Sequence, residues 1–216
     1  MTIKPAPADA MRQLRYEQWV EDNRAFVYER GHERIGYQHI QQMNGESLDK
    51  FRRELFSESR GKEALIVDVR FNGGGGIHED LTNLLDRRPF GYSALRGAPR
   101  TLQPELLWKG PIVVLINPSS YSDAEIFPHV MQELGLGVLL GEPTGGNVIG
   151  TFDFQLLDGS GFRLPGAGWW LLSGKDMEGN GAVPDVLVPL DPAAARSGRD
   201  NQLEEAVKLL MGKMGG

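Results

Sequence analysis

Two continuous apolar runs dominate the pattern of hydrophobic and polar positions along the chain. KEALIVDVRF (62–71) and PIVVLINP (111–118) are rich in β-branched residues and show no polar alternation. This pattern is typical of strands that are buried on both faces of a parallel sheet. Shorter strands are predicted at 34–42, where polar and apolar residues alternate, and at 137–146. The segment 183–190 predicts a last strand, and its two prolines favour the edge of a sheet.

Between these runs, apolar residues recur three and four positions apart, which predicts helices. The predicted helices cover residues 10–30, 47–59, 78–87, 122–135 and 201–213. Gly31 is expected to end the first helix, and Ser47 is a candidate N-cap of the second. Pro128 should kink the fourth helix unless that helix begins late. The Pro- and Ala-rich residues 1–9 are expected to form a flexible N-terminus.

Strands that alternate with helices over short connections predict an α/β fold with a mostly parallel sheet flanked by helices. The whole of residues 10–213 is expected to form a single domain. Residues 88–110 contain turn residues and little periodicity, so they are predicted to be loop. Residues 151–172 predict an added β-hairpin region, with LDGSG (157–161) as a tight turn.

Composition narrows the class of protein. The chain has 216 residues, 40% of them hydrophobic, which is enough for one sizeable core. The net charge is −6 and there is no basic run, so nothing favours a nucleic-acid partner. No segment approaches the roughly 18 apolar residues of a membrane span, and the first residues lack the apolar core of a signal peptide. The absence of cysteine excludes disulfides and thiolate metal sites and is compatible with a reducing compartment, so the cytoplasm is favoured.

The candidate chemistry lies where the two buried runs end. The first run is followed by NGGGG (72–76), and the second by SSYSD (119–123). Ligands collect at the carboxyl ends of strands in open α/β sheets, and glycines let a ligand approach backbone amides closely. Any of the serines could simply cap the next helix. The functional interpretation selects Ser122, because the N–H of Asp123 follows it and can donate to an oxyanion, with the glycine loop as the source of a second donor.

Three ordered motifs resemble a known family of peptidases. EALIVDVRFNGGG, VVLINPSSYSDAEIFPHVMQELGLGVLLGEPTGG and EGNGAVPDVLVPL are similar to the catalytic part of the tail-specific, or C-terminal processing, proteases, and most of all to the tricorn branch. The resemblance covers roughly residues 34–190. It implies a ClpP/crotonase-like fold, a serine nucleophile, peptide or unfolded protein substrates and no cofactor. It also implies hexamers, although the sequence itself leaves the state of any homo-oligomer open.

The resemblance also implies roles for individual residues. Ser122 matches the nucleophile, and the backbone N–H of Asp123 matches one donor of the oxyanion hole. Gly74 or Gly75 would supply the other donor. Glu178, in DMEGNGAVPD, matches the acidic residue that orients the catalytic relay in the tricorn branch.

The general base departs from the family pattern. Most tail-specific proteases have a lysine in the turn that reads GEPTGGNV here, and Asn147 stands in its place. The tricorn branch uses a histidine from a small domain that lies upstream of a PDZ module. We therefore expect this chain to be a fragment of a longer peptidase with upstream PDZ and histidine-bearing domains, inactive when isolated. The alternative is a natural short form that has lost its base, and among the four histidines His78 is the candidate for a substitute.

Two other functions remain open at this point. A non-catalytic domain of the same fold could bind a peptide or an apolar ligand in a groove lined by Trp169 and Trp170. A crotonase-type acyl-CoA enzyme would share the oxyanion architecture, but it would leave Ser122 and Asp123 without a purpose. No metal site is predicted, because the histidines are scattered and no cysteine is present.

Overall fold

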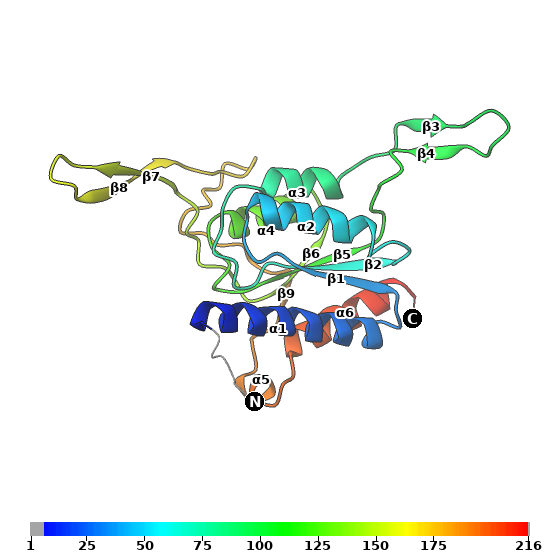
Figure 1. Ribbon diagram of the computed structural model, residues 1–216, viewed down its shortest axis with the longest axis horizontal. Coiled ribbons are helices and arrows are strands. Elements are labelled where there is room, and N and C mark those ends of the chain that lie inside the picture. The colour runs from blue at the N-terminus through cyan, green and yellow to red at the C-terminus, as the bar shows by residue number, and fades with distance from the viewer. Residues whose placement is uncertain (1–6, 216) are drawn as a thin grey trace.

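A central parallel sheet organises the computed structural model, which describes residues 7–215. Within that range, five parallel strands lie in the order β1, β2, β5, β6, β9, which is also their order along the chain (Figure 1). The strands are β1 (Ile35–His39), β2 (Ala64–Asp68), β5 (Ile112–Ile116), β6 (Val138–Gly141) and β9 (Val186–Leu187). Because β9 is at the edge of the sheet, the edge position expected from its flanking prolines is confirmed.

Helices cover both faces of this sheet (Figure 1). One face carries α2 (Gly45–Phe56), α3 (His78–Leu85) and α4 (Asp123–Glu133), and the other carries α1 (Ala8–Arg30) and α6 (Asn201–Lys213), with the short α5 (Pro192–Arg196) beside them. Alternate residues of β2, β5 and β6 enter opposite cores. In β5, for example, Val114 joins the cluster of Phe51 and Phe127, whereas Leu115 joins that of Val27 and Leu210. Strands that bury both faces explain the uninterrupted apolar runs in the sequence.

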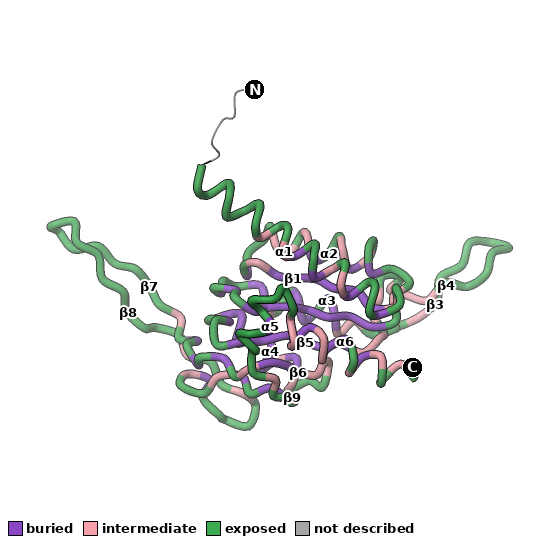
Figure 2. The backbone as a smooth tube through the Cα atoms, turned by 90° about the horizontal axis from the view of Figure 1, so that it is seen from below, coloured by how far each residue is buried: buried purple, intermediate pink, exposed green. Residues whose placement is uncertain are grey.

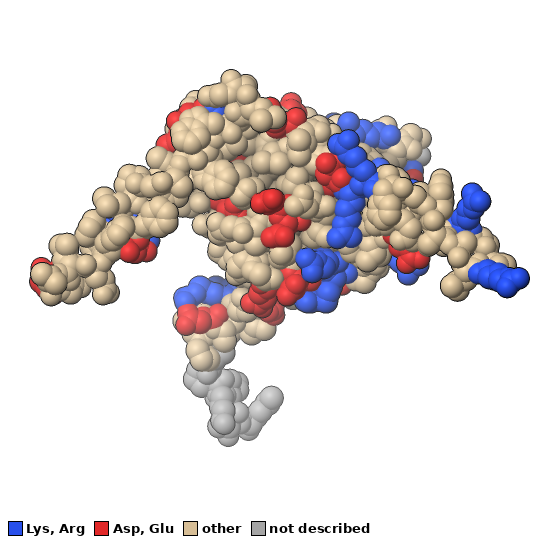
Figure 3. Space-filling model, turned by 90° about the horizontal axis from the view of Figure 1, so that it is seen from above, with Lys and Arg blue, Asp and Glu red and all other residues tan. Residues whose placement is uncertain are grey.

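Two hairpins extend beyond the buried body at opposite ends (Figures 1 and 2). One is formed by β3 (Gly91–Ser93) and β4 (Thr101–Gln103), the other by β7 (Gly150–Gln155) and β8 (Gly161–Ala167). We call the second hairpin the β7–β8 arm. Its register pairs Phe152 with Leu164 and Phe154 with Phe162, so one face of the arm is apolar. Few charged side chains are seen on the arm in Figure 3.

The predicted α/β architecture with a parallel sheet, flanking helices and a hairpin at 151–172 is confirmed, with several local corrections. Residues 88–110 are not all loop, since they contain β3 and β4. The N-cap of α2 is Asn44 rather than Ser47, because the Asn44 side chain accepts from the Ser47 N–H at 2.9 Å. The helix α5 was not predicted at all.

The ends of two helices also differ from expectation. The helix α1 begins at Ala8, inside the segment 1–9 that was expected to be flexible, and residues 1–6 of that segment lie outside the described residues. The helix α4 does not begin late, because it runs from Asp123 through the buried Pro128. Among the helices that the structure describes, none is both long and apolar enough to cross a membrane.

Candidate active site

The carboxyl ends of β2 and β5 bring the two candidate segments together. These strands are adjacent and parallel, with Val67 paired to Val114. The glycine bend (72–76) therefore lies beside the serine turn (117–122). One backbone hydrogen bond joins them directly, from the Tyr121 N–H to the Asn72 carbonyl oxygen at 2.9 Å. The predicted meeting of these two segments is what the topology produces.

Gly74 packs closely against Ser122. A Cβ added at Gly74 would lie 2.7 Å from the Ser122 Cβ and 3.3 Å from the Asp123 nitrogen. Gly74 also has a φ of +91°, a conformation that L side chains rarely adopt. Glycine is needed here because the bend passes too close to the serine for any side chain.

The three serines of the turn have different environments. Ser119 is exposed. Ser120 is buried, and its hydroxyl donates to the Val69 carbonyl oxygen at 2.9 Å, which ties the turn to the end of β2. Ser122 is partly exposed and sits at the N-terminus of α4. Ser122 alone combines access to solvent with a position beside the glycine bend.

The backbone of Ser122 is strained. Its φ of 54° and ψ of −118° lie outside the regions that residues with a side chain usually occupy, at a cost of about 1–3 kcal/mol. A sharp, strained turn before a helix is the geometry that presents the nucleophile in many serine hydrolases. The next residue, Asp123, is the first of α4, and its N–H has no hydrogen-bond acceptor among residues 7–215. An unpaired N–H at a helix N-terminus is suited to bind a negatively charged oxygen.

The two glycines named as second donors are not equivalent. The Gly74 N–H already donates to the Asn72 side-chain oxygen at 2.9 Å. The Gly75 N–H has no acceptor within the described part of the chain. Gly75 has a φ of +150°, and a Cβ there would lie 1.9 Å from the Met43 carbonyl oxygen. Of the two, Gly75 is therefore the one whose N–H is available to a ligand.

The Asp123 side chain connects the serine turn to α3. Its Oδ2 accepts from the N–H groups of Ile77 at 2.7 Å and His78 at 3.1 Å, and its Oδ1 is hydrogen-bonded to Nδ1 of His78. The His78 ring also packs edge-on against Trp169, with centroids 5.1 Å apart. His78 is thus held by Asp123 and Trp169.

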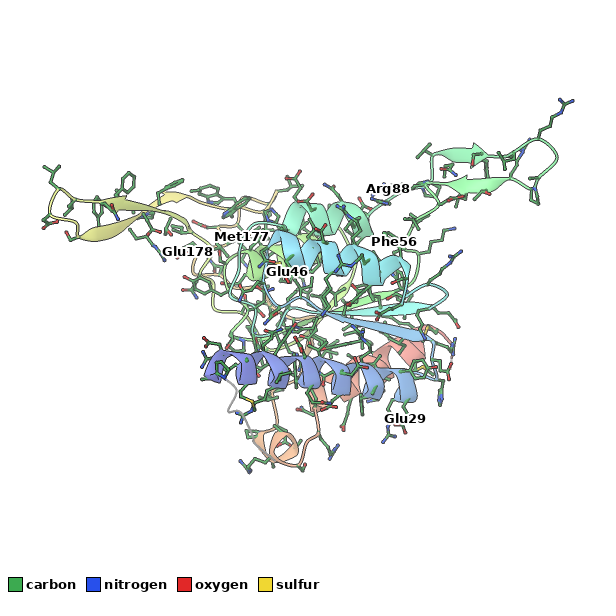
Figure 4. The ribbon with its side chains drawn as sticks, viewed as in Figure 1. Glu29, Glu46, Phe56, Arg88, Met177 and Glu178 are labelled. Atoms are coloured by element: carbon green, nitrogen blue, oxygen red, sulfur yellow. The ribbon has the colours of Figure 1, made fainter. Side chains whose placement is uncertain are left out.

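Glu178 lies near the base of the β7–β8 arm (Figure 4). Its carboxylate accepts from the N–H groups of Val148 at 2.8 Å and Ile149 at 2.9 Å. Within residues 7–215, none of its hydrogen bonds reaches Ser122 or a histidine. The carboxylate therefore holds the loop that leads into β7.

Sequence reasoning missed Glu125, which is completely buried behind Ser122. Its side chain accepts from the Ser122 N–H at 3.2 Å and from the Asn147 N–H at 2.8 Å. The signal that could have found it is the spacing in Ser122-Asp-Ala-Glu125, the S-x-x-E pattern of a capping box. Asn147, which stands where most tail-specific proteases have a lysine, contributes its backbone to this arrangement.

Two ion pairs of the buried Arg70 hold the chain just before the glycine bend. The Arg70 guanidinium contacts Asp68 at 2.7 Å and Asp200 at 2.8 Å, and all of Arg70 but 1% is buried. Burial alone would raise the pKa of the Asp68 carboxyl, but the Arg70 guanidinium holds that pKa below its usual value. Because Arg70 comes two residues before Asn72, these contacts fix the point at which the chain enters the bend.

No histidine or lysine side chain within residues 7–215 is hydrogen-bonded to the Ser122 hydroxyl. His129 is buried and its Nε2 pairs with the Asn180 carbonyl oxygen at 3.2 Å, and burial lowers its pKa. His39 is also buried, between Tyr16 and the Arg70 carbonyl oxygen. The described residues contain no group of three or more metal-ligating side chains.

A cavity of about 690 Å³ lies elsewhere. Phe56, Trp108 and Lys109 are among its lining residues, and Figure 4 shows Phe56 on the opposite side of the central body from Glu178. None of the residues that line it belongs to the glycine bend or the serine turn. An extended chain needs an open surface rather than a deep cavity, so cavity size is a poor guide to a site that binds peptides.

The chain matches a known protein family and several known relatives. A model of peptidase family S41 matches residues 34–188. The chain belongs to peptidase family S41. This S41 chain is 38% identical over 200 residues to tricorn protease homolog 1 of Streptomyces coelicolor, covering 92% of this chain and 19% of the relative. It is 37% identical over 205 residues to the tricorn protease of Thermoplasma acidophilum, covering 94% of this chain and 19% of the relative.

Solved structures of S41 relatives share the fold. The crystal structure of the tricorn protease superposes with a TM-score of 0.85 at 35% identity, covering 95% of this chain and 20% of that one. The photosystem II D1 C-terminal processing protease superposes with a TM-score of 0.59 at 25% identity, covering 82% and 46%. The resemblance to tail-specific proteases of the tricorn branch and the predicted ClpP/crotonase-like fold are confirmed. The S41 chain spans about a fifth of the length of the tricorn relatives that it matches.

Proposed function

We propose that this S41 chain carries the nucleophile and the oxyanion hole of a serine peptidase. Ser122 is the nucleophile, and the N–H groups of Asp123 and Gly75 bind the oxyanion. The observation that supports the proposal is the close approach of Gly74 to Ser122, because it brings the glycine bend beside a partly exposed, strained serine whose next residue has an unpaired N–H. In serine hydrolases, each donor of this kind is worth about 3 kcal/mol of transition-state stabilisation.

The reaction follows from these roles. A base takes the Ser122 hydroxyl proton as Oγ bonds to the carbonyl carbon of a peptide, and the carbonyl oxygen becomes an anion held by the two N–H groups. Collapse of this intermediate breaks the C–N bond, and the leaving amine takes the proton from the base. Water then hydrolyses the acyl-enzyme by the same steps.

The base is proposed to come from outside this chain, from an upstream histidine-bearing domain that accompanies a PDZ module. This fits the absence of a histidine or lysine bonded to Ser122 within residues 7–215. His78 remains the alternative, since its Nδ1 donates to Asp123 and this leaves Nε2 as the basic nitrogen. Glu178 would orient the base in the assembled enzyme.

A fluorophosphonate probe tests the proposal, because it forms a covalent bond only with an activated serine. We expect slow labelling of the chain at Ser122, located by peptide mass spectrometry, and faster labelling when imidazole is added as an external base. Ser122→Ala should remove the label, whereas Ser119→Ala, at the exposed serine of the same turn, should not. Loss of imidazole-independent labelling in His78→Ala would identify His78 as the base. Labelling elsewhere, or none with imidazole present, contradicts the proposal.

Peptide binding without cleavage is the second candidate function. The exposed Trp170, which is 60% accessible, and the apolar face of the β7–β8 arm are the observations that favour it. An unlabelled chain that binds an extended apolar peptide, measured by tryptophan fluorescence, would support this function over hydrolysis.

A further inference from the structure

Behind Ser122 lies a buried carboxylate to which the proposed reaction assigns no role. Glu125 is 0% exposed, and its two oxygens accept hydrogen bonds from four groups. Oε1 accepts from the N–H groups of Ser122 at 3.2 Å and Asn147 at 2.8 Å. Oε2 accepts from the Thr144 hydroxyl at 2.6 Å and from the Gly146 N–H at 2.5 Å.

These bonds connect three segments that are distant in the sequence. Glu125 joins the serine turn to residues 144–147. The Thr144 hydroxyl oxygen in turn accepts from the Ala182 N–H at 2.8 Å, and the Gly146 carbonyl oxygen accepts from the Gly179 N–H at 2.8 Å. The segment 178–182, which begins with Glu178, is thereby tied to the same carboxylate.

We infer that Glu125 is a positioning residue of the candidate active site, holding Ser122 in its strained conformation and fixing residues 144–147 against the serine turn. A helix cap alone would explain the bond from Ser122, but not the three donors from the other loop. A strained backbone persists only when its surroundings over-determine it, and the bond to the Ser122 N–H acts on the strained residue itself. The effect of Glu125 on the reaction of Ser122 rests on the proposed function, whereas its role in holding the serine turn and residues 144–147 together does not.

Glutamine is the substitution that separates these bonds from packing. A carboxylate offers two acceptor oxygens, while the carboxamide offers one oxygen and an NH₂ group that would face two donors. Glu125→Gln therefore keeps the shape and loses acceptance on one side. Glu133→Gln is the matched control, because Glu133 lies on the same helix and is exposed.

The first readout is amide hydrogen exchange by NMR, which needs no catalysis. In Glu125→Gln, the amides of Ser122, Gly146 and Asn147 should exchange about tenfold faster or more, while those of β5 stay unchanged. Glu133→Gln should leave all of them unchanged. Unchanged exchange in Glu125→Gln, or an equal change in Glu133→Gln, would overturn the inference.

The second readout separates positioning from general structural support. In the fluorophosphonate reaction, Glu125→Gln should lower the maximal labelling rate of Ser122 by about 10- to 100-fold while leaving the probe's inhibition constant unchanged. If the wild type is labelled and Glu125→Gln is labelled at the same maximal rate, Glu125 has no role in positioning Ser122 for reaction. If the wild type is not labelled at all, the proposed function fails, and the exchange experiment still decides the role of Glu125.

A second pair of variants covers the case in which Glu125→Gln does not fold. Thr144→Val removes one donor to Glu125 at nearly constant volume, and Thr144→Ser keeps the hydroxyl. Thr144→Val should speed exchange of the Gly146 amide and slow labelling, whereas Thr144→Ser should do neither. Identical behaviour of the two variants would contradict the inference.

Discussion

The contact between Gly74 and Ser122 makes a quantitative prediction for Gly74→Ala. The new methyl group would meet the Ser122 Cβ at 2.7 Å and the Tyr121 carbonyl oxygen at 2.8 Å, while the residue stays at a φ of +91°. A positive φ costs an alanine about 1–2 kcal/mol, and overpacking typically costs about 1–3 kcal/mol. We therefore expect the free energy of unfolding to fall by about 2–5 kcal/mol, a large part of the total stability of a domain.

Gly76→Ala is the control for this measurement. An added Cβ at Gly76 meets no atom within 4 Å, and its φ is not in the positive range. Both variants lose the same conformational entropy in the unfolded chain, so that contribution cancels in the comparison. Urea unfolding followed by tryptophan fluorescence gives the two free energies, and fluorophosphonate labelling reports whether Ser122 has moved. Stabilities that agree within about 0.5 kcal/mol, the size of an ordinary surface effect, would refute the close contact.

Two further predictions concern stability. Burial lowers the pKa of His39 in the folded state, so below about pH 6.5 the unfolded chain binds a proton that the folded chain does not. The free energy of unfolding should therefore fall with pH, by up to about 1.4 kcal/mol per pH unit for this residue. Urea titrations from pH 7.5 to 5.5 should show this slope, and an equally steep slope in His39→Gln would contradict the prediction. Phe127→Ala, at a fully buried position, should cost about 3–5 kcal/mol in urea unfolding, whereas Phe154→Ala on the exposed β7–β8 arm should cost less than about 0.5 kcal/mol; equal losses would mean that the arm packs on the core.

The central sheet could be predicted well because strands buried on both faces appear in the sequence as continuous apolar segments. Residues 64–67 and 112–116, which form most of β2 and all of β5, are all apolar, and the order of the strands along the chain is their order in the sheet. The β3–β4 hairpin has no such apolar segment, since each strand has three residues and none of them is buried. Short exposed strands are defined by pairing with each other, which periodicity does not record.

The same distinction applies to the site. The meeting of Ser122 with the glycine bend could be predicted, because the carboxyl ends of adjacent parallel strands share one edge. The choice between Gly74 and Gly75 could not, since it depends on where the Asn72 side chain points. The environment of His78 depends on Trp169, which approaches only in the folded chain. Side-chain directions and long-range contacts of this kind have no signature in a single sequence.

The ion pairs of Arg70 have a consequence for how the molecule is made. Arg70 and the glycine bend are synthesised long before Asp200, which is the N-cap of α6 and the second carboxylate partner of Arg70. A nascent chain that has completed β2 but not α6 carries a guanidinium with only one of its two counter-ions, and an incompletely neutralised buried charge is strongly destabilising. Ser122 is therefore expected to reach its final geometry only after α6 has left the ribosome.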